Sequence, residues 1–290
     1  MGALVSSHSS ELGEWEMTER LPHRLLLPYI RRYCGYVENT SFSSRIHAAN
    51  GDIVIIIGFG SPTRSIDLRC PDRSSTHQSF FAGLFDSPVI TESCGATGGL
   101  QIDFTPIGAY RFFGVPMHEL ANRVVDLADL LGPFAARLSE QLQSLPAWEP
   151  RFELVERMIA ERVGAAPEGS AAVVLAYDRI CASGGQAAIG AIAGELGWSQ
   201  KHLIHRFREQ IGLPPKTLSR IVRFGRATEL MRDPNAGPWA DIAYRCGYSD
   251  QSHLIRDFHE FAGAAPSAFA ARMLPETAAS GVTAFKRTSR

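Results

Sequence analysis

Two segments in the last third of the chain share one pattern of apolar and polar residues. In each segment an Ile-Ala pair is followed in the same order by Gly, Ser, Leu, Phe, Gly and Pro, from Ile192 to Pro215 and from Ile242 to Pro266. The offset between the copies is 50 residues up to the serine and 51 residues from the leucine onward. Two copies are too few for a solenoid, which needs about three to bury a core. The pattern therefore predicts a pair of like modules.

Each module consists of a predicted helix, a glycine turn and a second helix. Apolar residues at helical spacing lead to Gly197 or Gly247, and such a glycine commonly ends a helix. Ser199 stands where the next helix needs an N-cap, as does Ser249 or Asp250 in the second copy. The apolar stripes of the second helices are formed by Leu203 and Phe207, and by Leu254 and Phe258. This arrangement is typical of a helix-turn-helix, although a single copy fits a plain helical hairpin equally well.

The charge distribution favours a nucleic-acid partner for this half of the chain. Residues 199–232 contain eight Lys or Arg and two acidic residues. Residues 171–290 contain 15 basic and 10 acidic residues, whereas residues 1–170 contain 14 and 20. The overall net charge of −1 therefore conceals a basic half and an acidic half. Such asymmetry indicates that the basic half binds nucleic acid.

The double module resembles the C-terminal DNA-binding domain of the AraC family over roughly residues 171–273. The resemblance is carried by the Ile-Ala pair, the Gly and Ser, the Leu-x3-Phe and the Gly-x2-Pro in both copies. It implies a seven-helix domain whose two recognition helices enter successive major grooves of double-stranded DNA. Residues 214–231 would form the linking helix, on the order of 27 Å long at about 1.5 Å per residue. That length suits two reading helices about one DNA turn, roughly 34 Å, apart.

The resemblance also implies which residues contact DNA. The predicted base-reading residues are Lys201, Ile204 and His205 in the first recognition helix, and Gln251, Ser252, Ile255 and Arg256 in the second. Arg256 suits guanine and Gln251 suits adenine, because the forked end of each side chain can form two hydrogen bonds to one edge of that base. Ser199 and Gln200 complete the predicted set at the start of the first recognition helix, and Arg208, Arg220 and Arg223 are expected on phosphates. For any one of these residues, a solvated position on a helix face is the alternative.

The first half of the chain predicts a β-rich domain with added helices. Residues 53–57 form a β-branched run, which predicts a strand buried on both faces. Leu100, Ile102 and Phe104 alternate with polar residues, as in a half-exposed strand. Residues 62–76 are polar and rich in turn formers, and we expect a surface loop there. Amphipathic helices are predicted at 126–131, 133–145 and 148–163.

These patterns predict an α+β protein in which a small β-barrel-like or sandwich-like domain with helices precedes an all-α domain with two helix-turn-helix motifs. The expected divisions are a mobile leader at 1–20, a sensory or dimerisation domain at 21–163, a linker at 164–170, the DNA-binding domain at 171–274 and a flexible tail at 275–290. The N-terminal half is also similar to the input domain of a subset of AraC-type regulators, through Leu27-Pro28-Tyr29-Ile30 and the segment 99–132. Candidate ligand-binding residues are Phe59, Phe81, Phe85, Phe104, Tyr110 and Arg111, and the alternative for the aromatic ones is a role in the core.

Other classes of chemistry lack a sequence signal. No glycine-rich nucleotide loop, zinc-protease motif or nucleophile elbow occurs, so no enzyme, cofactor or metal site is predicted. No apolar run approaches the ~18 residues of a membrane helix. The five cysteines are scattered and odd in number, which indicates reduced thiols in a cytoplasmic protein.

The sequence therefore predicts a transcription regulator that reads DNA and responds to a small-molecule effector or a partner at its N-terminal domain. By family resemblance its other partners would be RNA polymerase and a second copy of the chain, and no membrane. Two alternatives remain: an enzymatic or ligand-carrying N-terminal domain with an appended DNA-binding module, and a ligand-independent dimeric regulator.

Overall fold

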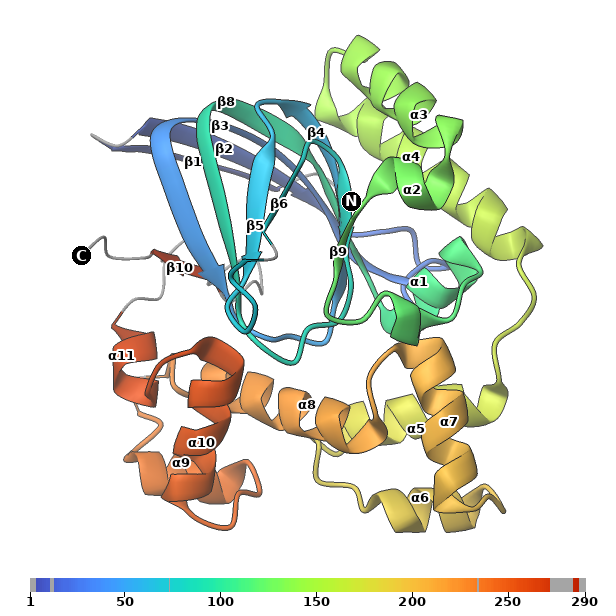
Figure 1. Cartoon of the computed structure of the whole chain (residues 1–290), viewed down its shortest axis with the longest axis vertical. Coiled ribbons are helices and arrows are strands. Elements are labelled where there is room, and N and C mark those ends of the chain that lie inside the picture. Colours follow the sequence, from blue (N-terminus) through green and yellow to red (C-terminus); the bar gives the residue numbers. More distant parts are fainter. Residues whose placement is uncertain (1–3, 11–12, 73, 234, 272–283, 287–290) are drawn as a thin grey trace.

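A long, bent antiparallel sheet and a cluster of helices form the two halves of the molecule (Figure 1). The structure is a computed structural model, and it describes residues 4–10, 13–72, 74–233, 235–271 and 284–286. The chain passes from the N-terminal half to the C-terminal half between α4, which ends at Ala165, and α5, which begins at Ala171. The predicted linker at 164–170 falls on this connection.

The sheet belongs to the N-terminal half. Its strands are β1 Leu4–Ser10, β2 Gly13–Arg20, β3 Ile30–His47, β4 Ile53–Gly60, β5 Thr63–Asp67, β6 Ser75–His77, β7 Phe80–Ala82, β8 Val89–Phe104, β9 Val124–Asp126 and β10 Ala284–Lys286. The main order is β1-β2-β3-β8-β4-β7-β9, while β5 joins β8 and β6, and β10 joins β3. Within the described residues this order does not return to its start, so the sheet is open and not a closed barrel. The predicted α+β class with a β-rich N-terminal domain is confirmed.

The alternation of side chains along the strands gives the sheet two different faces. In β4, Ile53, Ile55 and Ile57 are almost fully buried in the hydrophobic core on the face covered by helices. Val54 and Ile56 point to the opposite face, where they line a cavity. Both faces of β4 are therefore apolar, as the β-branched run predicts.

Four helices and one 3-10 turn cover the first face of the sheet. They are α1 Pro106–Phe113, η1 Met117–Glu119, α2 Leu127–Leu131, α3 Pro133–Ser144 and α4 Trp148–Ala165. In α4, the Phe152 ring lies 6.1 Å from the ring of Tyr33 in β3. Trp148 lies on Gly35, where a Cβ would approach the indole to 2.2 Å. Because β3 has no side chain at Gly35, α4 packs directly on the strand.

Two expectations for the N-terminal half are wrong. Most of the supposed leader forms β1 and β2, and β2 pairs with β3 from Gly13↔Thr40 to Arg20↔Tyr33. The predicted loop at 62–76 contains β5 and the start of β6. These strands are polar, and they form because β3 and β8 offer backbone partners along their length, which local composition does not reveal. In the predicted tail, residues 284–286 pair with β3 as β10, and the remainder lies outside the described residues.

The C-terminal half is helical, as predicted. In the described part of the chain its seven helices are α5 Ala171–Ala182, α6 Ile189–Glu195, α7 Gln200–Ile211, α8 Pro215–Leu230, α9 Trp239–Arg245, α10 Gln251–Ala262 and α11 Pro266–Ala270. Helix α8 runs between the α6–α7 pair and the α9–α10 pair (Figure 1). Its Phe224 packs edge-on against Phe258 of α10 at 4.8 Å and Phe269 of α11 at 6.2 Å. The seven-helix domain with a long linking helix is thereby confirmed.

Candidate nucleic-acid interface and ligand cavity

Helices α7 and α10 are the second helices of the two modules, and both begin with a side-chain cap. The Ser199 hydroxyl accepts from the backbone N–H of His202 at 3.2 Å, and the Asp250 carboxylate accepts from that of His253 at 2.7 Å. In the second module the cap is therefore Asp250 and not Ser249. The hydrogen bond from the His253 N–H lowers the pKa of Asp250, so a negative charge stands at the start of α10.

Each recognition helix buries one stripe and exposes another. In α7, Leu203 and Phe207 are fully buried, which agrees with the apolar stripe read from the sequence. The exposed side carries six predicted DNA-binding residues: Ser199, Gln200, Lys201, Ile204, His205 and Arg208. Lys201, Ile204 and Arg208 follow the i, i+3, i+7 spacing of a single helix face. Ile204 is 39% exposed, which is unusual for isoleucine and leaves its side chain free to contact another molecule.

Helix α10 has the same arrangement with a different charge. Its predicted readers Gln251, Ser252 and Arg256 are exposed, and Ile255 is half-buried. The opposite side is closed by Leu254, Phe258 and Phe261, all fully buried. From the cap to the last turn, α10 carries one arginine and three acidic residues, whereas α7 carries three basic residues and one acid. The first module is thus the basic one.

Two of the predicted phosphate contacts are engaged inside the protein. Arg220 of α8 donates to Asp257 at 2.7 Å and to Glu260 at 2.5 Å, both in α10. Arg223 donates to the backbone carbonyl of Gly247 at 3.1 Å, and its guanidinium lies 5.1 Å from the centre of the Tyr248 ring. These arginines hold the second module against α8, so the expectation that they contact phosphates is not supported by their positions. Arg208 is exposed on α7.

Aromatic residues directly after the turn glycines support both recognition helices, and the sequence reading overlooked them. The Trp198 ring packs edge-on against His202 at 4.5 Å. In the second module, Tyr248 packs edge-on against His253 at 5.1 Å. The signal available in the sequence was an aromatic residue directly after the turn glycine and a histidine directly before the core leucine in both copies.

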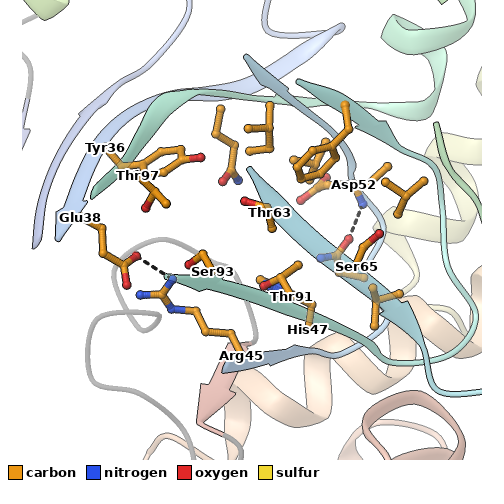
Figure 2. Close-up of a pocket in the computed structure, with 18 of the residues that line it drawn as sticks. Tyr36, Glu38, Arg45, His47, Asp52, Thr63, Ser65, Thr91, Ser93 and Thr97 are labelled. Atoms are coloured by element: carbon orange, nitrogen blue, oxygen red, sulfur yellow. Dashed lines mark hydrogen bonds and ion pairs between the residues drawn. The ribbon is translucent and has the colours of Figure 1, made fainter. Parts of the chain in front are cut away.

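A cavity of about 250 Å³ lies on the sheet face opposite the helices (Figure 2). Hydroxyl and amide groups from alternate positions of β5 and β8 line part of it: Thr63, Ser65, Thr91, Ser93, Thr97 and Gln101. Apolar side chains line much of the remainder: Trp15, Met17, Val54, Ile56, Phe80, Phe85, Val89 and Val124. The cavity is therefore mostly apolar with a row of neutral polar groups, as in many small-molecule sites.

Each arginine or carboxylate on the cavity wall has a partner of opposite charge. Arg45 contacts Glu38 at 2.8 Å, a pair drawn in Figure 2. Arg32 contacts Asp103 at 2.5 Å and also Glu19. Asp52 lies 3.4 Å from Arg31 on the outer side. No arginine on this wall needs a ligand to neutralise it.

Two titratable groups of the cavity have shifted pKa values. Burial, with Arg45 nearby, lowers the pKa of His47 to about 4, so the ring is neutral at pH 7. Its Nε2 lies 2.8 Å from the Thr91 hydroxyl. Burial, with Asp103 nearby, raises the pKa of Asp52 to about 6. Both shifts favour the neutral form of the group.

Among the six residues predicted to bind a ligand, Phe85 lines the cavity and the other five do not. Phe81 and Phe104 are fully buried on the helix-covered face of the sheet, and Phe59 lies under Arg151. Tyr110 packs against the hydrophobic core from α1. Arg111 donates to the Tyr29 hydroxyl at 2.6 Å and to the carbonyl of Val163 at 2.8 Å. The aromatic residues chosen from the sequence thus mark the core face, whereas the alternating polar residues of β8 mark the cavity.

The loop after β3 connects this cavity to the DNA-binding half. Ala48, Asn50 and Asp52 line the cavity. Between them, the backbone N–H of Ala49 donates to the carbonyl of Phe261, at the end of α10, at 2.8 Å. Arg31, beside Asp52, donates to the hydroxyl of Tyr177 in α5 at 3.0 Å. We call residues 48–52 the bridging loop.

Two other kinds of site are absent from the part of the chain that the structure describes. No group of three or more His, Cys, Asp or Glu side chains there could hold a metal ion. Among the same residues, no helix combines the length and the apolar character needed to cross a membrane.

Comparisons with known proteins agree with this geometry. Residues 192–272 match a family model described as a helix-turn-helix domain, and residues 18–126 match a domain of unknown function (DUF6597). The HTH-type transcriptional activator RhaS of Shigella boydii serotype 18 is 36% identical over 69 residues, which is 24% of each chain. The HTH-type transcriptional regulator YbfI of Bacillus subtilis (strain 168) is 36% identical over 58 residues, or 20% of each chain. The matched part is thus about a quarter of these relatives or less.

A solved structure of ToxT from Vibrio cholerae is similar at low level, with 13% identity and a TM-score of 0.42 over 90% of this chain and 98% of that one. The C-terminal part of the chain, in which α8 joins two helix-turn-helix modules, is therefore similar to the helix-turn-helix domains of HTH-type transcriptional activators.

Proposed function

We propose that the protein is a sequence-specific regulator of transcription whose helices α7 and α10 enter successive major grooves of DNA. The observation that carries this proposal is the repeated geometry of the two modules. In both, a capped helix turns a polar face outward while an apolar stripe is fully buried. In the proposed complex, helix α8, with 16 residues and a length of about 24 Å, holds the two modules apart so that α7 and α10 reach grooves about one turn of DNA apart. The protein would accordingly act in the cytoplasm.

Within this proposal, the exposed residues divide into two groups. Arg256 and Gln251 read guanine and adenine, because each side chain can form two hydrogen bonds to one base edge. Lys201, Ile204 and His205 provide the contacts of the first module, with Ile204 offering an apolar contact to a thymine methyl group. Arg208 binds phosphate and adds affinity without base preference.

The N-terminal domain regulates this binding through its cavity. The bridging loop supports this part of the proposal, since it lines the cavity and also bonds to the end of α10 through Ala49. A ligand that shifts the loop would shift α10 relative to α7. A change in the spacing of the two helices changes which DNA both can occupy at once, so ligand binding and DNA binding become linked.

The test is DNA binding by the native chain at several salt concentrations, on a duplex selected from a random library and on random DNA. We expect Arg208→Ala to weaken both duplexes alike and to reduce the slope of log affinity against log salt by about one. Arg256→Ala should cost about 1–3 kcal/mol on the selected duplex and much less on random DNA. Equal losses on both duplexes for Arg256→Ala would contradict its role as a reader.

A further inference from the structure

The charges around the cavity restrict the kind of ligand that it can hold. We infer that the cavity binds an uncharged molecule with an apolar body and one or more hydroxyl or carbonyl groups. This inference rests on the proposed regulation by a ligand and names the chemistry of that ligand.

The arginines on the cavity wall already have acidic partners. The carboxylate of Glu38, with its side chain only 6% exposed, already neutralises Arg45 at 2.8 Å. Arg32 is likewise neutralised by Asp103, whose side chain is 5% exposed. A carboxylate or phosphate ligand would have to displace one of these acids or lie beside it, and an ammonium ligand would meet the arginines. Burying a charge without a partner is strongly unfavourable, so both ligand classes are disfavoured.

The cavity wall supplies neutral hydrogen-bonding groups. Thr91, Ser93 and Thr97 come from alternate positions of β8, and Thr63 comes from the neighbouring β5 (Figure 2). Hydroxyl groups both donate and accept, so this row suits ligand hydroxyls or carbonyls. The His47 ring belongs to the same row as a neutral donor or acceptor, because burial lowers its pKa to about 4.

The size of the cavity and its apolar side chains suit a small apolar body. Met17, Ile56 and Phe80 are among the apolar residues that line the cavity. A cavity of about 150 Å³ with such walls holds benzene, and this cavity measures about 250 Å³. The ligand therefore has room for at least a single ring with a polar substituent.

The test uses three probes that have nearly the same shape and differ in charge: 2-phenylethanol, phenylacetate and 2-phenylethylamine. Binding to the full native chain is measured by calorimetry and by the shift in melting temperature at pH 7.5. We expect the alcohol to bind with millimolar or better affinity, at least tenfold more tightly than either charged probe. Tighter binding of phenylacetate or the amine would overturn the inference, as would failure of the alcohol to bind at millimolar concentration.

Two variants assign the effect to this cavity. Ser93→Phe fills the space and should abolish binding of the alcohol, whereas Thr76→Phe, at an exposed position of β6 outside the cavity, should not. Glu38→Gln keeps the shape of the side chain but leaves Arg45 without its anion. In this variant the preference for the alcohol over phenylacetate should fall at least tenfold, and an unchanged preference would contradict the electrostatic argument.

These measurements need no DNA. A chain that binds the alcohol but no DNA would contradict the proposed function alone, and a chain that binds selected DNA but prefers phenylacetate would contradict the ligand class alone.

Discussion

Arg220 illustrates how a residue's role depends on what lies beside it. Seen in the sequence, it is one of eight basic residues in a segment expected to bind DNA. In the fold it lies between Asp257 and Glu260, and hydrogen bonds to Glu260 and Asp257 raise the pKa of its guanidinium. The Asp257 side chain is 1% exposed, so it depends on Arg220 for its neutralisation. Arg220 therefore stabilises the packing of α10 on α8.

Replacing Arg220 should consequently affect stability more than DNA contact. Arg220→Ala leaves the buried Asp257 unpaired, and we expect the free energy of unfolding to fall by about 3 kcal/mol in chemical denaturation. Arg208→Ala is the matched control, because Arg208 is exposed on α7 and its loss should change stability by less than about 0.5 kcal/mol. If Arg220→Ala keeps the native stability but loses DNA affinity, Arg220 contacts phosphate and the packing role is contradicted.

His47 and Asp52 make opposite contributions to the pH dependence of folding stability. The pKa of His47 falls from 6.5 to about 4 on folding, so the unfolded chain takes up its proton first and stability is lost between pH 6.5 and 4. The pKa of Asp52 rises from 3.8 to about 6, so the folded chain takes up that proton first and stability is gained as pH falls from 6 to 3.8. In the native chain the two contributions largely cancel over this range.

Single substitutions should separate them. Asp52→Asn leaves His47 unopposed, and its loss of stability between pH 7 and 4 should exceed that of the native chain. His47→Gln removes the histidine contribution, on the order of 3 kcal/mol at full shift, so stability should fall less on acidification. Urea denaturation across this pH range measures both. Parallel curves for the native chain and both variants would contradict the assigned pKa shifts.

At the scale of elements, the helices were predictable and several strands were not. The stripes of α7 and α10 repeat with the helical period, so the sequence pattern predicts both helices. The packing of α7 on η1 and α1 of the N-terminal half was not predictable in this way. Strands β1, β2 and β5 lack an apolar run, and their existence depends on pairing with β3 and β8. Most of the predicted ligand-binding residues do not line the cavity for a related reason. Side chains of a strand alternate between its two faces, and the aromatic residues chosen from the strands lie on the core face.

The caps of the two recognition helices differ in charge, and this difference is testable. Asp250→Ser keeps a side-chain acceptor for the N–H of His253 but removes a negative charge from the end of α10 that we propose to face DNA. We expect DNA affinity at low salt to rise about three- to tenfold, because repulsion of the phosphates is removed, and the gain should shrink at high salt. The melting temperature should stay unchanged, whereas Asp250→Ala should lower it. A loss of affinity on selected DNA alone would instead indicate that Asp250 reads a cytosine amino group.

For the whole molecule, the contacts between the halves could not be read from the sequence. The bond from Ala49 to Phe261 joins residues more than two hundred positions apart, and it is formed by backbone groups that carry no residue signature. Arg31 and Tyr177 are similarly remote, and neither belongs to a recognisable motif. These contacts place the cavity wall next to the end of α10, and the proposed link between ligand and DNA rests on them.

The most direct test of the central claim is a hydroxyl-radical footprint of the purified full chain on a duplex selected from random DNA. If α7 and α10 both read DNA, the footprint consists of two protected blocks about ten base pairs apart on one face of the helix. Arg256→Ala should weaken one block and leave the other. A single block, or protection that ignores sequence, would contradict the account of two readers joined by α8.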